Sequence, residues 1–213
     1  MRCTVRRPDE PAMLFHYIAD IVTGLCLLAL IAAIVVNFQA GRMARGFAER
    51  RSPVSTASMT AVGLLVYATI RFRWGGLPLN TDPPMLALRA AGLLVLILGT
   101  AFNIWGRLHL KGNWADQVRI YDDQSLVTDG PYRFVRHPLY ASLLWMIYGA
   151  AIAYLSPLAA LEGALIFYPM MIYRAQLEES ALVDKFGATY ENYRQKTGRF
   201  LPRLADVRGT SVQ

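Results

Sequence analysis

The 213-residue chain is rich in apolar residues and carries little charge for its length. Hydrophobic residues make up 54% and charged residues 17%, against roughly 25% charged in an ordinary soluble domain. The net charge is +7, but no basic stripe interleaved with aromatic residues is present, which argues against a nucleic-acid partner. The two cysteines lack Cys-x-x-Cys spacing, so the pattern excludes a disulfide framework and a cysteine-based metal site.

The chain contains five apolar blocks of about the length that crosses a bilayer, roughly 20 residues in a helix. They span about 14–38, 54–72, 85–105, 139–155 and 158–173. The first block is too long for the apolar core of a signal peptide, so we interpret it as a retained transmembrane helix. Only Ser156 and Pro157 separate the last two blocks, which predicts a helical hairpin. The sequence therefore predicts an all-α integral membrane protein with about five transmembrane helices.

Lys and Arg residues are distributed unequally between the two predicted sides of the membrane. With five spans and the C-terminus inside, segments 39–53, 106–138 and 174–213 hold sixteen of the 22 Lys and Arg residues, and the outer segments hold five. Positive residues concentrate on the cytoplasmic side of membrane proteins. We therefore expect a multi-pass protein with its N-terminus outside and its C-terminus in the cytoplasm.

A polar segment precedes the fourth block. Residues 124–140 read Gln-Ser-Leu-Val-Thr-Asp-Gly-Pro-Tyr-Arg-Phe-Val-Arg-His-Pro-Leu-Tyr, and its Asp-Gly-Pro is turn chemistry. Pro138 disfavours a helical conformation at His137 and suits the first position of a helix, so the fourth helix is predicted to begin at Pro138, with His137 at its entrance. A helix N-terminus favours an anion such as the carboxylate of an amino-acid-like cofactor.

A second polar segment follows the fifth block, within which Pro169 predicts a kink. If the fifth helix continues past Tyr173, Arg174 and Glu178 lie one turn apart on one face. Apolar and aromatic residues then recur at spacings of three and four: Leu182, Phe186, Tyr190 and Tyr193. This spacing predicts a C-terminal amphipathic helical region that folds back over the site, and Gly187 predicts a kink or a break within it.

Two stretches carry a family resemblance. They are Leu-Val-Thr-Asp-Gly-Pro-Tyr-Arg-Phe-Val-Arg-His-Pro-Leu-Tyr at 126–140 and Glu-Glu-Ser-Ala-Leu-Val-Asp-Lys-Phe-Gly-Ala-Thr-Tyr-Glu-Asn-Tyr at 178–193. They resemble the motifs of the isoprenylcysteine carboxyl methyltransferase (ICMT) family, which is related to membrane phospholipid methyltransferases. The resemblance covers roughly the last hundred residues and implies a C-terminal catalytic region over 106–213, with the cofactor loop, the hairpin and the amphipathic helix. The first three apolar blocks, which match the family only as membrane spans, form an expected N-terminal three-helix transmembrane region over 1–105.

The resemblance also implies a cofactor, a substrate and site residues. It implies S-adenosyl-L-methionine in a cytosolic pocket, a lipophilic or prenylated substrate that enters from the membrane lipids, and no metal. The motif positions that bind the cofactor correspond to Gln124, Ser125, Leu126, Val127, Tyr132, His137, Pro138, Leu139 and Tyr140. The positions that face the methyl acceptor correspond to Arg174 and Glu178. Gln124 stands where the family often has histidine, and glutamine also donates and accepts hydrogen bonds.

The chemistry of the acceptor leaves several functions open. A carboxylate acceptor is ionised at neutral pH and needs no general base, and the planar fork of Arg174 binds both of its oxygens. If the acceptor is an amine, Glu178 or His137 is the candidate base. We expect carboxyl methylation of an isoprenylcysteine-like substrate. The alternatives are N-methylation of a phospholipid or small lipid, a non-catalytic membrane scaffold of the same fold, and a nicotinamide-dependent reductase without a glycine-rich dinucleotide motif.

Two charged pairs also have structural explanations. Arg174 and Glu178 are alternatively an interfacial ion pair at a helix end. His16 and Asp20, one turn apart in the first block, are expected to extend toward the outer interface rather than to form a site.

Overall fold

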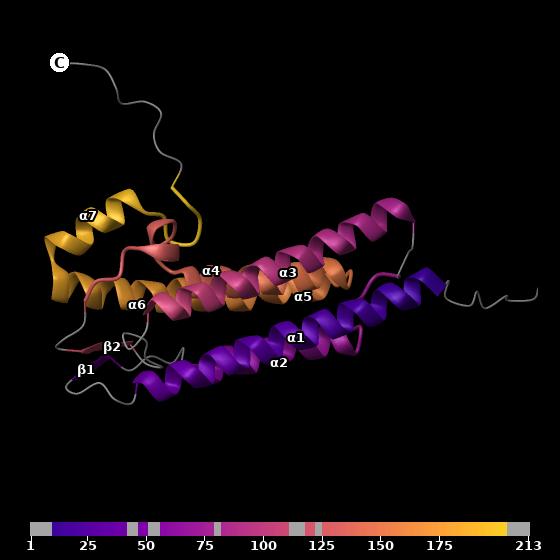
Figure 1. Cartoon of the computed structure of the whole chain (residues 1–213), viewed down its shortest axis with the longest axis horizontal. Helices are drawn as coiled ribbons and strands as arrows, with labels where there is room; N and C mark the ends of the chain where they lie inside the picture. The colour runs from indigo at the N-terminus through magenta and orange to yellow at the C-terminus, as the bar shows by residue number, and fades with distance from the viewer. Residues whose placement is uncertain are drawn as a thin grey trace, which may run out of the picture.

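The computed structural model describes residues 10–41, 47–50, 56–78, 82–110, 118–121 and 125–203. Helices predominate (Figure 1): α1 (Glu10–Gly41), α2 (Thr56–Arg71), α3 (Pro83–Leu110), α4 (Pro138–Ala153), α5 (Pro157–Glu162), α6 (Tyr168–Phe186) and α7 (Ala188–Lys196). A 3₁₀ turn, η2 (Gly130–Arg133), precedes α4, and a π-helical turn, η3 (Gly163–Phe167), joins α5 to α6.

Each predicted apolar block is helical in the structure. Three helical segments are long and apolar enough to cross a membrane: Met13–Val36, Pro83–Leu110 and Pro157–Phe186, the last of which combines α5, η3 and α6. Ala57–Arg71 and Pro138–Ala153 form shorter apolar helices. The chain is therefore a multi-pass membrane protein with a predominantly helical fold.

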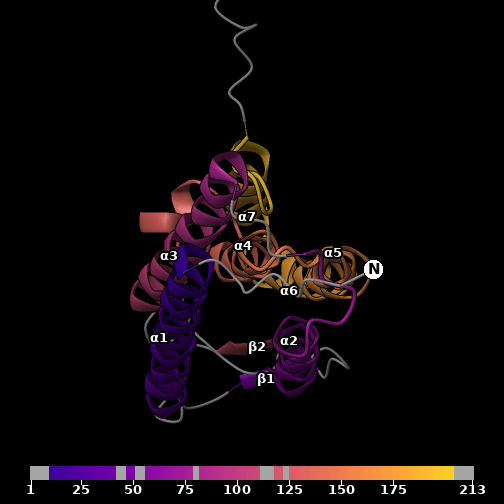
Figure 2. The ribbon, with the colours of Figure 1, turned by 90° about the vertical axis from the view of Figure 1, so that its right-hand side faces the viewer.

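A small sheet is an addition to the predicted all-α fold. β1 (Phe47–Arg50) pairs antiparallel with β2 (Val118–Tyr121), so that 47 lies opposite 121 and 50 opposite 118. Four-residue strands within polar connections are too short for an alternating pattern to reveal them. The sheet ties the segment after α1 to the segment after α3, and Figures 1 and 2 show it near the end of α1.

α3 and α4 pack closely because glycines line their contact. A Cβ atom on Gly92 would lie 2.6 Å from the backbone nitrogen of Ala153, and one on Gly149 would lie 2.6 Å from that of Leu96. Small residues that allow backbones to approach are the usual means of packing helices in lipid, where apolar burial alone gives little. α1 packs on α3, whereas α2 packs on α4 and α5. Seen end-on in Figure 2, α4 lies between α3 and α6. In the same view, α1 lies on the side of α3, and α2 lies apart from α1 on the side of α5 and α6.

The hairpin predicted at Ser156 and Pro157 is confirmed. α4 ends at Ala153, and Ser156 caps α5 by accepting a hydrogen bond from the Ala159 N–H at 3.3 Å. Pro157 occupies the first turn of α5, where its missing N–H costs no helical hydrogen bond. The cap at Ser156 and the proline at 157 therefore explain why the connection between α4 and α5 is so short.

The segment after this hairpin departs twice from a regular α-helix. In η3, directly before Pro169, the N–H of Tyr168 donates to the carbonyl of Gly163, five residues earlier. Gly187 adopts φ +51°, a left-handed conformation that glycine reaches without steric cost. α6 accordingly ends at Phe186, and α7 begins at the residue after Gly187, which confirms the predicted break.

Candidate active site

One cavity of about 750 Å³ is lined by residues of α1, α2, α3, α4, α6 and α7. One end of it gathers the polar motif residues: Ser125, Leu126, Val127, Tyr132, His137, Pro138, Leu139, Tyr140, Arg174 and Glu178. Gln124, the remaining predicted site residue, lies outside the described residues. Two segments that are far apart in the sequence therefore meet on the wall of a single cavity.

The start of α4 places His137 between two carboxylates. α4 begins at Pro138, as predicted, and His137 precedes it with non-helical φ −123° and ψ 67°. The buried imidazole lies with Nδ1 3.5 Å from Glu178 Oε2 and Nε2 3.1 Å from Glu179 Oε1. Burial lowers the pKa of His137, but its contacts with the two carboxylates outweigh burial and raise the pKa above its ordinary value. The site therefore favours the charged imidazolium.

Arg174 and Glu178 form the predicted pair on one face of α6. Nε of Arg174 donates to Tyr140 Oη at 2.7 Å and to Glu178 Oε1 at 3.2 Å. The Tyr140 hydroxyl in turn donates to Glu178. The Arg174 side chain is 3% exposed, which argues against an interfacial surface ion pair. Charge-assisted hydrogen bonds of this kind hold the guanidinium in one orientation.

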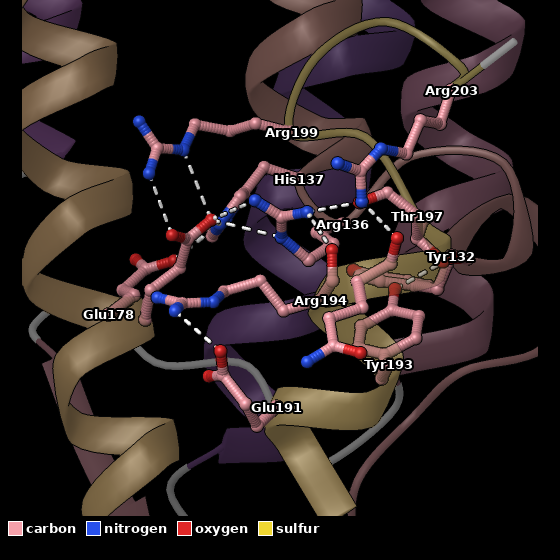
Figure 3. Close-up of polar contacts among 12 residues, drawn as sticks. Tyr132, Arg136, His137, Glu178, Glu191, Tyr193, Arg194, Thr197, Arg199 and Arg203 are labelled. Carbon is pink, nitrogen blue, oxygen red and sulfur yellow. Dashed lines mark hydrogen bonds and ion pairs between the residues drawn. The ribbon is translucent and has the colours of Figure 1, made fainter. Parts of the chain in front are cut away.

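Glu179 is the centre of a second network, whose members Arg136, His137 and Arg199 are labelled in Figure 3. Its Oε1 accepts from Arg136 Nε at 3.1 Å, Arg136 Nη2 at 3.0 Å and Arg199 Nε at 3.1 Å. Its Oε2 accepts from Arg199 Nη2 at 2.8 Å. The side chain is 4% exposed, so this carboxylate is buried and fully paired, as a buried charge requires. No role was predicted from the sequence for Glu179, Arg136 or Arg199, since no local spacing signals their pairing.

The segment at 197–200 covers the start of α4. The N–H of Arg136 donates to the carbonyl of Gly198 at 2.8 Å, and the N–H of His137 donates to that of Arg199 at 3.1 Å. Arg136 also donates from its side chain to the carbonyls of Arg194 and Thr197. The chain after α6 therefore returns over the polar end of the cavity.

α7 contributes to this covering as well. Tyr190 and Tyr193 lie on the cavity wall, and the Tyr193 hydroxyl donates to the Tyr132 carbonyl at 2.6 Å. Of the four residues predicted to form one amphipathic face, Leu182 and Phe186 belong to α6 and the two tyrosines to α7. The helix axis therefore changes at Gly187, while the apolar and aromatic spacing continues from α6 into α7.

The sequence predicted no site residue before Gln124, so it did not connect Arg107 with Tyr132. The Tyr132 hydroxyl is buried and has no hydrogen-bond partner among the described residues. Burial raises the pKa of Tyr132, the Glu178 carboxylate raises it further, and the Arg107 guanidinium opposes both. Nε of Arg107 donates to Asn103 Oδ1 at 2.8 Å within α3. The C-terminal end of α3 thus reaches the polar end of the cavity.

The opposite end of the cavity holds a separate polar group. The Tyr154 hydroxyl donates to Asp20 Oδ1 at 2.8 Å and to Thr23 Oγ1 at 3.1 Å, and His16 Nε2 lies 3.9 Å from Asp20 Oδ2. Apolar side chains line the stretch between the two ends, among them Leu30, Ile34, Leu96, Leu143, Met146 and Ile147. The cavity is therefore polar at its ends and apolar along its length.

The polar end is suited to binding carboxylates. Arg107 and Arg174 both lie on the cavity wall, and the first turn of α4 carries the partial positive charge of a helix N-terminus. Within the described part of the chain, no group of three or more His, Cys, Asp or Glu side chains could hold a metal ion. The arrangement suits an anionic or amino-acid-like ligand beside an apolar channel.

Comparison with known proteins relates this architecture to membrane methyltransferases. The profile described as the isoprenylcysteine carboxyl methyltransferase (ICMT) family matches residues 91–184. A probable protein-S-isoprenylcysteine O-methyltransferase of Oryza sativa subsp. indica is 32% identical over 113 residues, 52% of this chain and 59% of that protein. The protein-S-isoprenylcysteine O-methyltransferase of Rattus norvegicus is 28% identical over 123 residues, 57% of this chain and 43% of that protein.

The similarity extends to another kind of protein and to a solved structure. The cobalt-zinc-cadmium resistance protein CzcN of Cupriavidus metallidurans is 33% identical over 143 residues, 66% of this chain and 58% of that protein. A solved structure of the eukaryotic intramembrane Ras methyltransferase ICMT aligns with a TM-score of 0.56 and 25% identity, over 70% of this chain and 53% of that chain. The chain spans about half the length of the relatives it matches.

Proposed function

We propose that the chain belongs to the isoprenylcysteine carboxyl methyltransferase family, which its matches to that family support, and that it is an integral membrane methyltransferase that uses S-adenosylmethionine. The proposed acceptor is the carboxylate of an isoprenylcysteine-like lipophilic substrate. One observation carries this proposal: the buried Arg174, held by Tyr140 and Glu178, faces a cavity whose length is apolar. A carboxylate-binding group and room for a hydrophobic chain thus share one space.

The residues at the polar end fit the methyl donor. Tyr132 offers a buried hydroxyl that lacks a partner among the described residues, and the first turn of α4 favours an anion. Leu126, Val127 and Leu139 supply apolar surface on the same wall. When bound, S-adenosylmethionine supplies a sulfonium methyl group for in-line displacement. The other proposed contacts are those that the motif implies: Gln124, Ser125, His137, Pro138 and Tyr140.

In the proposed mechanism the protein positions the acceptor and excludes water. Arg174 binds both oxygens of the acceptor carboxylate, while Tyr140 and Glu178 keep the guanidinium in place. A carboxylate is ionised at neutral pH, so no general base is required. Well-oriented reactants in a closed site gain roughly 7–11 kcal/mol over the reaction in water, and the segment at 197–200 supports such closure by covering the start of α4.

We also propose five membrane spans, with the polar end of the cavity on the cytoplasmic side. The sixteen Lys and Arg residues in 39–53, 106–138 and 174–213 support this orientation. α2 and α4 have 16 residues each and rise about 24 Å, somewhat less than the roughly 30 Å of a bilayer core. Local thinning of the bilayer accommodates such helices. The division at residue 105 into a membrane region and a catalytic region stays a prediction.

The proposal is tested by methyl transfer from radiolabelled S-adenosylmethionine in detergent or liposomes. A prenylcysteine analogue and phosphatidylethanolamine are offered side by side as acceptors. Methyl esters release methanol in alkali, whereas methylated amines are stable, so the product reports the class of acceptor. We expect alkali-labile label on the prenylcysteine analogue, and loss of this activity in Arg174→Leu.

Other outcomes identify the alternatives. Alkali-stable label on the lipid would indicate N-methylation and overturn the carboxylate assignment. Saturable binding of S-adenosylhomocysteine without transfer to either acceptor would favour the non-catalytic scaffold. A folded wild-type protein that binds no S-adenosylhomocysteine would contradict the methyltransferase proposal as a whole.

A further inference from the structure

We infer that Arg107 binds the carboxylate of the methyl donor, so that α3 forms part of the cofactor site. The inference rests on the proposed function, since it matches one charged group of S-adenosylmethionine to one side chain. It goes beyond the motif segments, because Arg107 lies before both of them.

Arg107 is fixed in place by a short relay to α4. It lies in the last turn of α3, is 7% exposed and lines the cavity. Its Nε donates to Asn103 Oδ1 at 2.8 Å. Nδ2 of Asn103 donates to Ser142 Oγ at 2.7 Å and to the Leu139 carbonyl at 3.2 Å. The amide of Asn103 therefore links the Arg107 guanidinium to the first turns of α4 and fixes its position there.

The last turn of α3 lies directly on the start of α4. A Cβ atom on Gly106 would lie 3.0 Å from Leu139 Cδ2 and 3.6 Å from Pro138 Cγ. The first turn of a helix presents N–H groups that no carbonyl of the helix accepts, together with partial positive charge. Arg107 thus adds a full positive charge beside a terminus that already favours an anion.

Tyr132 gives an independent indication that a ligand binds here. It is 7% exposed and lines the cavity, and its hydroxyl has no partner among the described residues. A buried hydroxyl without a partner loses the hydrogen bonds that it made in water, so an acceptor atom from a ligand is expected. Arg107 is near enough for its charge to act on this phenol. A cation, a hydroxyl donor and a helix N-terminus together match a carboxylate.

Two guanidinium groups on different helices allow two carboxylates to be bound separately. Arg174 is on α6 and is held by Tyr140 and Glu178, where the proposed acceptor is bound. Arg107 lies with Tyr132 and the first turn of α4, the segment that the motif associates with the cofactor. We therefore match Arg107 to the amino-acid end of the donor and Arg174 to the acceptor.

The test removes the carboxylate from the ligand and the charge from the protein. The full chain is titrated calorimetrically in detergent with S-adenosylhomocysteine and with its decarboxylated analogue, for the wild type, Arg107→Met and Arg107→Lys. Arg107→Met is expected to weaken binding of S-adenosylhomocysteine about ten- to a hundredfold, and Arg107→Lys less. The affinity for the decarboxylated analogue should be the same in all three. Arg71→Met is the matched control, because Arg71 lines the same cavity on α2.

Each contrary result separates this inference from the proposed function. Equal losses for both ligands would show that Arg107 only supports the fold. An unchanged affinity for S-adenosylhomocysteine, with a raised KM for the acceptor, would move Arg107 to the acceptor and overturn the inference. If the folded wild type bound no S-adenosylhomocysteine, the proposed function would fail, and the inference with it.

Discussion

Glu178 and Glu179 are neighbours in the sequence, and both contact the His137 ring, yet they enter different networks. Glu178 faces the cavity and accepts from Arg174 Nε at 3.2 Å. Glu179 is not among the residues that line the cavity, and it accepts from Arg199 Nη2 at 2.8 Å. One residue thus belongs to the proposed chemistry, and the other to the covering of the site.

Glu178→Gln should impair methyl transfer more than cofactor binding. The amide oxygen can still accept from Arg174, but it does not balance the Arg174 charge, so the guanidinium is held less firmly. We expect kcat/KM to fall at least about tenfold, as misplacement of a reacting group does, with a smaller change in S-adenosylhomocysteine affinity. Steady-state kinetics and calorimetry measure both quantities. An unchanged kcat/KM would show that Glu178 does not orient the acceptor site.

Glu179→Gln should destabilise the protein by about 3 kcal/mol, because it leaves the largely buried Arg136, whose side chain is 9% exposed, without its counter-charge. Thermal unfolding in detergent measures the effect. Glu191→Gln is the matched control: Glu191 pairs with Arg194 at 2.7 Å in an exposed position, where an ion pair contributes at most about 1 kcal/mol. Equal shifts for the two variants would contradict the buried network.

Stability should depend on pH through His137. Its pKa is raised in the folded protein, since the two carboxylates outweigh burial. The stabilisation is therefore fully present below the ordinary pKa of about 6.5 and is lost as pH rises through the folded value. Between about pH 6 and about pH 9, the Tm advantage of the wild type over His137→Gln should shrink. The same pH dependence in both proteins would contradict this assignment.

Gly92→Ala should destabilise the contact between α3 and α4. The added Cβ would lie 2.6 Å from the backbone nitrogen of Ala153, and backbone cannot move aside as a side chain can. Overpacking of this kind costs about 1–3 kcal/mol. Gly24→Ala provides the control, because nothing lies within 4 Å of a Cβ at that position. Comparable unfolding temperatures for the two variants would disprove the close approach.

Much of the fold followed from local sequence signals. Pro138 marked the start of α4, Ser156 and Pro157 marked the hairpin, and Gly187 marked the break after α6. Each of these acts on its own backbone, so a short stretch of sequence is sufficient to predict it. The strands were missed because four residues in a polar connection show no periodicity.

The site was predictable only where its residues share a helix or a motif. Arg174 and Glu178 follow from helical spacing, and the structure pairs them at 3.2 Å. The pairing of Glu179 with Arg136 joins residues 43 apart, and nothing in either segment indicates the other. Arg107 lies just after the third apolar block, where a single arginine near the end of a helix is ordinarily an interfacial residue.

The bonds that residues 197–200 make to the start of α4 impose an order on biogenesis. These residues are synthesised after every helix that they tie together, so the ribosome can deliver the membrane spans to the bilayer while the polar end of the cavity is still open. The carbonyls of Gly198 and Arg199 then complete the main-chain bonds of Arg136 and His137. A chain truncated before Gly198 would lack both of these carbonyls, so the start of α4 would lose its main-chain bonds to the covering segment.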